Sequence, residues 1–128
     1  MSQENVEVAD AALAAFHRGA LEVALDYFDP EVELIAPPEF FRGHAGIRKV
    51  VADWPALFDD FRVDRERIID AHESGVVVLL TQRGRIKGSD GELRQPVGMH
   101  WEFREGKVRR WHAYLSWEEA LKAVGLEE

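Results

Sequence analysis

The chain has 128 residues, 46% of them hydrophobic, with no cysteine and a net charge of −8 from 16 basic and 24 acidic residues. This length suits one domain over residues 1–128, and the missing cysteines exclude disulfides, a thiol nucleophile and cysteine-ligated metal. The negative charge argues against a general binder of nucleic acid or anionic membranes. No apolar run is long enough to span a bilayer, and residues 1–15 lack a signal-peptide pattern, so we expect a cytoplasmic protein.

The first half of the chain predicts helices around one short strand. Apolar residues recur every three to four positions over residues 5–18 and again over 21–28, where Asp29-Pro30 ends the pattern. Residues 31–36 alternate like a strand and stop at Pro37-Pro38. Helical spacing returns over residues 45–61, with a break expected near Trp54 because Pro55 follows.

The second half predicts an antiparallel meander. Strands are expected over 62–71, 75–87, 93–104 and 107–115, separated in the last two cases by the turn signals 88–91 and Glu105-Gly106. A short helix then opens at Ser116 with a capping box. Helices followed by a meander predict an α+β domain, with N-terminal helices packed on one face of a curved, mainly antiparallel sheet.

Hairpin register predicts which side chains share a face. A turn at Ser89-Asp90 places Met99 opposite Leu80, and a three-residue loop at 104–106 places Met99 opposite Trp111. The face toward the helices would then be apolar and aromatic: Val76, Val78, Leu80, Val97, Met99, Trp101, Phe103, Trp111, Ala113 and Leu115. The other face mixes polar and apolar groups, which predicts a homodimer contact through His100, Arg110, His112 and Tyr114.

The inward face also predicts a pocket for a small hydrophobic ligand. Its candidate lining residues are Phe16, Trp54, Leu80, Gln82, Met99, Trp101 and Trp111. The alternative is that the aromatic residues among them are core, which is the usual role of such a stripe. The sequence leaves open whether residues 37–46 form a lid.

Histidines are the candidate acid–base groups. The register places His100 and His112 on the outer face, and a shift by one residue would turn both inward and make them the leading catalytic candidates. His17 ends a helix, where a cation suits the helix dipole. The five histidines are scattered and no HExxH pair occurs, so we expect neither a metal site nor a cofactor.

Several segments resemble a known family in their order and spacing. They are residues 17–21, 28–32, 43–47 and the C-terminal stretch Phe103-Arg104-Glu105-Gly106-Lys107-Val108 through Glu119-Ala120-Leu121. The chain resembles the SnoaL-like domains of the nuclear transport factor 2-like superfamily. The resemblance implies a cone-shaped α+β barrel with a pocket and a dimer through the outer sheet face. The superfamily includes isomerases, cyclases, hydrolases and binding proteins, so the fold leaves the function open.

The catalytic residues of ketosteroid isomerases do not carry over. The positions that would hold the base, the tyrosine and the proton-donating aspartate are Ala36, Ala12 and Met99. We therefore expect a binder of a small hydrophobic molecule. If the protein is an enzyme, we expect cofactor-free acid–base chemistry of isomerase, cyclase or hydrolase type. The alternative is a non-catalytic dimeric binding or scaffold protein with a filled core.

Overall fold

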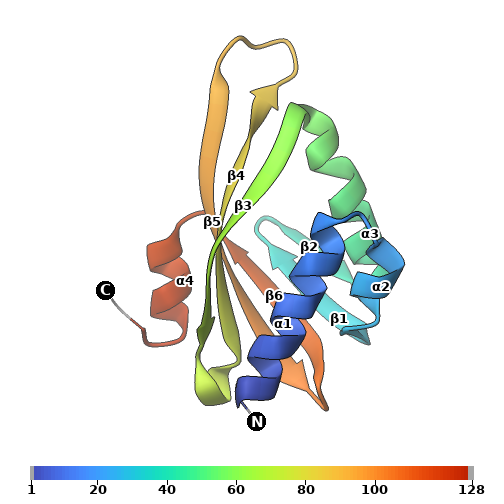
Figure 1. The fold of residues 1–128 in the computed structure, drawn as a ribbon, viewed down its shortest axis with the longest axis vertical. Coiled ribbons are helices and arrows are strands. Elements are labelled where there is room, and N and C mark those ends of the chain that lie inside the picture. Colours follow the sequence, from blue (N-terminus) through green and yellow to red (C-terminus); the bar gives the residue numbers. More distant parts are fainter. Residues whose placement is uncertain (1, 127–128) are drawn as a thin grey trace.

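The computed structural model describes residues 2–126 and contains one curved sheet flanked by helices (Figure 1). The helices are α1 (Ser2–His17), α2 (Leu21–Leu25), α3 (Gly43–Asp53) and α4 (Trp117–Ala123), with short 3-10 turns η1 (Pro55–Leu57) and η2 (His72–Ser74). The strands are β1 (Phe28–Ala36), β2 (Glu39–Arg42), β3 (Phe58–Asp70), β4 (Val76–Ile86), β5 (Glu92–Arg104) and β6 (Lys107–Tyr114). Within this range, no helix is both long and apolar enough to cross a membrane.

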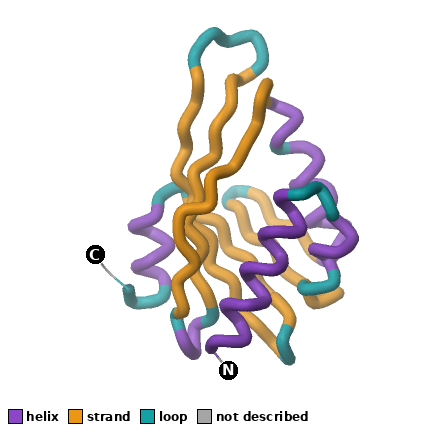
Figure 2. The backbone as a smooth tube through the Cα atoms, in the orientation of Figure 1, coloured by secondary structure: helices purple, strands orange, loops and turns teal. Residues whose placement is uncertain are grey.

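The sheet has the order β2-β1-β6-β5-β4-β3 and does not close into a barrel. Only the β1–β6 pair among these neighbours is parallel; the others are antiparallel. Helices α1, α2 and α3 lie on one side of the bent sheet, and α4 lies on the other (Figures 1 and 2). The predicted α+β class with N-terminal helices on a curved, mainly antiparallel sheet is confirmed.

The predicted end of the third helix is wrong, and the break expected near Trp54 is confirmed. The helical pattern expected up to residue 61 ends at Asp53, and Phe58 and Phe61 belong to β3. Proline at 55 lacks the amide hydrogen that a continuing helix needs, so the chain makes one 3-10 turn and then extends. Residues 37–46 contain regular structure, because Glu39–Arg42 pairs with the end of β1 and α3 begins at Gly43.

Both predicted hairpin registers are wrong by two residues, and the predicted faces are nevertheless kept. Val78, not Leu80, lies opposite Met99, because the loop after β4 is longer than a two-residue turn. Ala113, not Trp111, lies opposite Met99 across β5–β6, where a two-residue turn is combined with a bulge after Glu102. A shift by two preserves the side of the sheet on which each residue lies.

The main core lies between the inner face of the sheet and helices α1 to α3. It contains Val76, Val78, Leu80, Val97, Met99 and Trp101 of the predicted apolar face, together with Ala9, Leu13, Leu25, Phe28 and Ile47. Leu115 is the exception: it follows the end of β6 and is 71% exposed. The apolar residues of the inner face therefore pack against the helices, and some of them line the cavity described below.

A second, smaller core lies on the outer face of the sheet. Val77 and Leu79 are buried there under Ala120 and Leu121 of α4. These two strand residues were part of the reason for expecting a dimer, and a helix of the same chain covers them. The polar part of the outer face is not covered by α4, and the homodimer through it stays a prediction.

Candidate functional site

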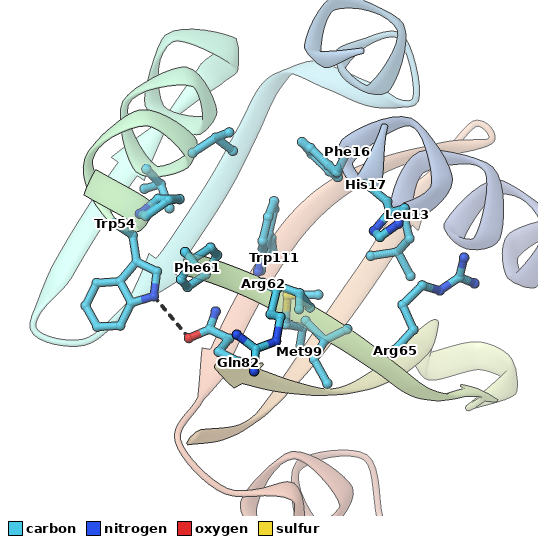
Figure 3. A pocket seen from close by; sticks show the side chains of 15 residues that line it. Leu13, Phe16, His17, Trp54, Phe61, Arg62, Arg65, Gln82, Met99 and Trp111 are labelled. Carbon is cyan, nitrogen blue, oxygen red and sulfur yellow. Dashed lines mark hydrogen bonds between the residues drawn. The ribbon is translucent and has the colours of Figure 1, made fainter. Parts of the chain in front are cut away.

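A cavity of about 440 Å³ opens between α1, α3 and the inner face of the sheet (Figure 3). Its wall is mainly apolar and consists of Leu13, Phe16, His17, Val50, Val51, Trp54, Pro55, Phe61, Arg62, Val63, Arg65, Leu80, Gln82, Met99 and Trp111. A concave apolar site of this size with a few polar groups is typical of small-molecule binding.

Local periodicity explains how each element reaches the cavity. Helix α1 presents Leu13, Phe16 and His17 at the i, i+3, i+4 spacing of one helix face. Strand β3 presents Phe61, Val63 and Arg65 by strand alternation. The cavity is therefore bounded on two sides by elements whose inward faces follow from their own sequence pattern.

Six of the seven predicted pocket residues line this cavity: Phe16, Trp54, Leu80, Gln82, Met99 and Trp111. Trp101 does not. It is fully buried behind the wall, with its ring 5.5 Å from that of Trp111 and 5.3 Å from that of Phe28. The indole nitrogen of Trp101 has no hydrogen-bond partner in the described part of the chain. Trp101 is thus a core residue that supports the cavity wall.

Trp54 and Gln82 meet across one end of the cavity. The Trp54 indole nitrogen donates a hydrogen bond of 3.0 Å to Gln82 Oε1 (Figure 3). Since an indole nitrogen only donates, the acceptor must be the amide oxygen, which fixes the orientation of the Gln82 amide. The Gln82 amide nitrogen, for which residues 2–126 supply no acceptor, is then left as a free donor in the cavity wall.

Three basic side chains complete the lining: His17, Arg62 and Arg65. Arg62 forms a 2.8 Å ion pair with Glu92, and its hydrogen bond lowers the pKa of that carboxyl below the usual value. Arg65 forms an ion pair with Asp10 of α1. In Figure 3, His17 and Arg65 lie beside Leu13, whereas Arg62 and Gln82 lie nearer to Trp54. No aspartate or glutamate is among the described residues that line the cavity.

Sequence reasoning missed these basic residues. His17 was interpreted as a helix-terminal cation, although its i+4 spacing from Leu13 already placed it on the apolar face of the helix. Arg65 lies on the same side of the strand expected over 62–71 as Val63, whereas alternation places Arg62 on the opposite side. This alternation was the signal that could have revealed Arg65, and no sequence pattern placed Arg62 at the cavity.

The predicted outer-face residues lie away from this cavity. His100 pairs with His112 across β5–β6, and the His112 ring stacks on Tyr114 at 4.3 Å. Burial, with His100 and Arg110 nearby, lowers the pKa of His112, and burial raises the pKa of Tyr114. Arg110 bridges Glu33 at 3.1 Å and Glu102 at 3.3 Å. The expected outward position of both histidines is confirmed, and neither reaches the cavity.

The cavity therefore offers apolar contact, hydrogen-bond donors and one imidazole. The imidazole belongs to His17, and histidine is the side chain that most often serves as a general acid or base. Met99, at the position where the resemblance would place a proton donor, lines the cavity with a thioether. Among the described residues, no group of three or more histidine or carboxylate side chains is arranged to hold a metal ion.

Comparison with known families identifies the domain. Residues 9–111 match the SnoaL-like domain family. The chain belongs to this family. No protein among the curated sequences matches it.

Several solved structures share this fold and match the chain over almost its whole length. TerC, crystallised with polyporic acid, is 22% identical over 94% of this chain and 98% of its own, with a TM-score of 0.77. An NTF2-like protein of unknown function from Burkholderia pseudomallei is 19% identical over 95% and 98%, also with a TM-score of 0.77. A candidate polyketide cyclase from Xanthomonas campestris pv. campestris is 18% identical over 97% and 98%, with a TM-score of 0.72. At these identities the likeness establishes the shared fold.

Proposed function

We propose that this SnoaL-like domain binds a small hydrophobic molecule in the cavity between α1, α3 and the inner sheet face. The observation that carries the proposal is a cavity of about 440 Å³ whose wall is mainly apolar and contains Trp54 and Trp111. Binding to such a wall removes apolar surface of the ligand from water, which lowers the free energy, and aromatic rings contribute large contact areas. The neighbour TerC was crystallised with a small molecule, which agrees with a binding role for this fold.

Binding can be tested with the neutral apolar fluorophore phenylnaphthylamine. We expect saturable binding with a blue shift, together with an increase in the melting temperature of the protein. A Val51→Phe substitution fills the cavity from α3 and should abolish both effects. Val23→Phe adds the same group at an exposed site on α2 outside the cavity and should leave them unchanged.

The alternative function, a scaffold with a filled core, makes the opposite prediction. The protein would then neither bind phenylnaphthylamine nor respond to it in a melting experiment. Binding that Val51→Phe leaves intact would also contradict the proposal, because the probe would then lie outside this cavity.

A second candidate function is cofactor-free acid–base catalysis on the bound molecule. It is favoured by the position of His17, whose imidazole lines an apolar cavity and has no protein partner among residues 2–126. Such a ring could take a proton from a carbon next to a carbonyl group and return it. In deuterated water, the protein should then catalyse exchange at the methyl group of acetylnaphthalene, as followed by NMR. His17→Asn should remove the exchange. The control His72→Asn lies in an exposed turn and should keep it. Absence of exchange with the original protein would leave binding as the function.

A further inference from the structure

The polar groups in the cavity wall share one property: nearly all of them donate hydrogen bonds. Arg62 and Arg65 carry donors only, and the Gln82 amide oxygen is already used by Trp54, which leaves the amide nitrogen. The Trp54 indole nitrogen is likewise a donor. His17 can donate through either ring nitrogen, depending on its tautomer, and through both when it is protonated.

Several of these donors have no partner among the residues that the structure describes. Arg65 uses one terminal nitrogen for Asp10 and has no other acceptor within residues 2–126, where Nε and its second terminal nitrogen have no partner. Arg62 uses both terminal nitrogens, for Asp60 O and Glu92, and keeps Nε free. No hydrogen-bond partner exists for the Gln82 amide nitrogen or the His17 ring among the described residues. A bound molecule that supplies acceptors would therefore meet donors at both ends of the cavity.

Among the described residues, the cavity wall holds basic side chains and no acidic ones, although the chain as a whole is acidic. The chain carries eight more acidic than basic residues, yet the lining has two arginines and a histidine and no carboxylate within the described range. Each arginine has one carboxylate partner, and both of these, Asp10 and Glu92, lie outside the lining. A cationic ligand would thus bring its charge against guanidinium groups without a carboxylate facing it.

We propose that the ligand class of this cavity is an apolar, aromatic-sized molecule that carries an anionic oxygen group, such as a carboxylate, an enolate or a sulfonate. The apolar body would pack between Phe16, Met99 and Trp111, and the anionic oxygens would accept from the unpartnered donors of the arginines and Gln82. Hydrogen bonds to charged groups are stronger than those between neutral groups, so the anion should contribute affinity as well as orientation. This inference rests on the proposed binding function and names its ligand chemistry.

A matched pair of probes separates the two proposals. Anilinonaphthalene sulfonate is the phenylnaphthylamine skeleton with one sulfonate added, so the two differ in the anionic group. We expect the sulfonate to bind about tenfold more tightly, which corresponds to one charged hydrogen bond. Arg65→Gln and Arg62→Gln should each reduce this preference severalfold while leaving the affinity for the neutral probe nearly unchanged. Arg67→Gln is the matched control, because Arg67 lies on the same strand outside the cavity lining.

Each outcome decides a different proposal. Equal affinities for the two probes, or tighter binding of the neutral one, would overturn the anionic ligand class and leave hydrophobic binding intact. A preference for the sulfonate that neither cavity arginine affects would overturn it too, because the anion would then bind elsewhere on the surface. Failure of both probes to bind would contradict the proposed function itself.

Discussion

Trp101 and Trp111 lie opposite each other on β5 and β6 but serve the cavity differently. Trp101 has no exposed surface and packs among Phe28, Trp111 and the strand residues of the core. Trp111 is half-buried and turns one side toward the cavity. Loss of the first side chain would leave a void inside the core, whereas loss of the second would enlarge a space that already exists.

This difference predicts unequal costs of truncation. Trp101→Ala should lower the free energy of unfolding by about 3–5 kcal/mol, as large aromatic truncations in cores do. Trp111→Ala should cost at least about 1 kcal/mol less, because part of its ring contacts no protein atoms. Urea denaturation followed by circular dichroism measures both. Equal costs for Trp101 and Trp111 would mean that the cavity closes in solution.

The candidate site shows which parts of a pocket a sequence can predict. Phe16, Met99 and Trp111 were predictable because strand alternation and helix spacing determine the inward side of each element. Trp101 shares that inward side, yet its depth behind Trp111 depends on how Phe28 of β1 packs against both indole rings. Such depth is set by packing between distant segments, which periodicity does not contain.

At the scale of elements, the hairpins kept their faces despite a wrong register. The β5–β6 turn has Glu105 and Gly106 at positive φ, as a two-residue hairpin turn requires, and one bulge after Glu102 restores the expected side. Local turn chemistry was visible in the sequence, whereas the bulge was not. The start of β3 was missed because apolar residues at 57, 58 and 61 fit helical spacing, and proline at 55 overrode that spacing.

Helix α4 lies on the outer face because β5 provides a glycine beneath it. A Cβ atom built on Gly98 would lie 2.4 Å from the Ala120 Cβ and 3.2 Å from the Ser116 carbonyl oxygen. The helix begins with Ser116, whose Oγ accepts from the Glu119 amide at 3.1 Å. Capping fixes where the helix starts, and the missing side chain allows close contact with the sheet.

Gly98→Ala should therefore push α4 away from the strands. We expect a loss of about 1–3 kcal/mol in the free energy of unfolding, the usual cost of overpacking, and faster hydrogen exchange in α4. Gly91→Ala is the matched control, because a Cβ there meets no atom within 4 Å. A similar effect of both substitutions would contradict the proposed close contact between α4 and β5.

At the scale of the whole molecule, the outer sheet face is divided between α4 and a polar strip. The strip contains the Glu33–Arg110–Glu102 ion pairs and the half-buried rings of His112 and Tyr114. Its apolar neighbours Val77 and Leu79 are already covered within the chain. A homodimer through this face would consequently rest on polar and aromatic contacts more than on a large apolar area.

We predict that the protein forms such a homodimer and that salt strengthens it. Each chain carries a net charge of −8, so two chains repel each other at long range, and ions screen this repulsion. Light scattering after size exclusion should show the mass of two chains at micromolar concentration, with more monomer at low ionic strength.

His112→Glu adds a carboxylate to a strip that already holds Glu33 and Glu102, and it should shift the population to monomer. Arg48→Glu makes a larger change in charge on α3, on the opposite side of the sheet, and should leave the dimer in place; a monomer at every salt concentration would show that α4 and the strip satisfy this face without a partner.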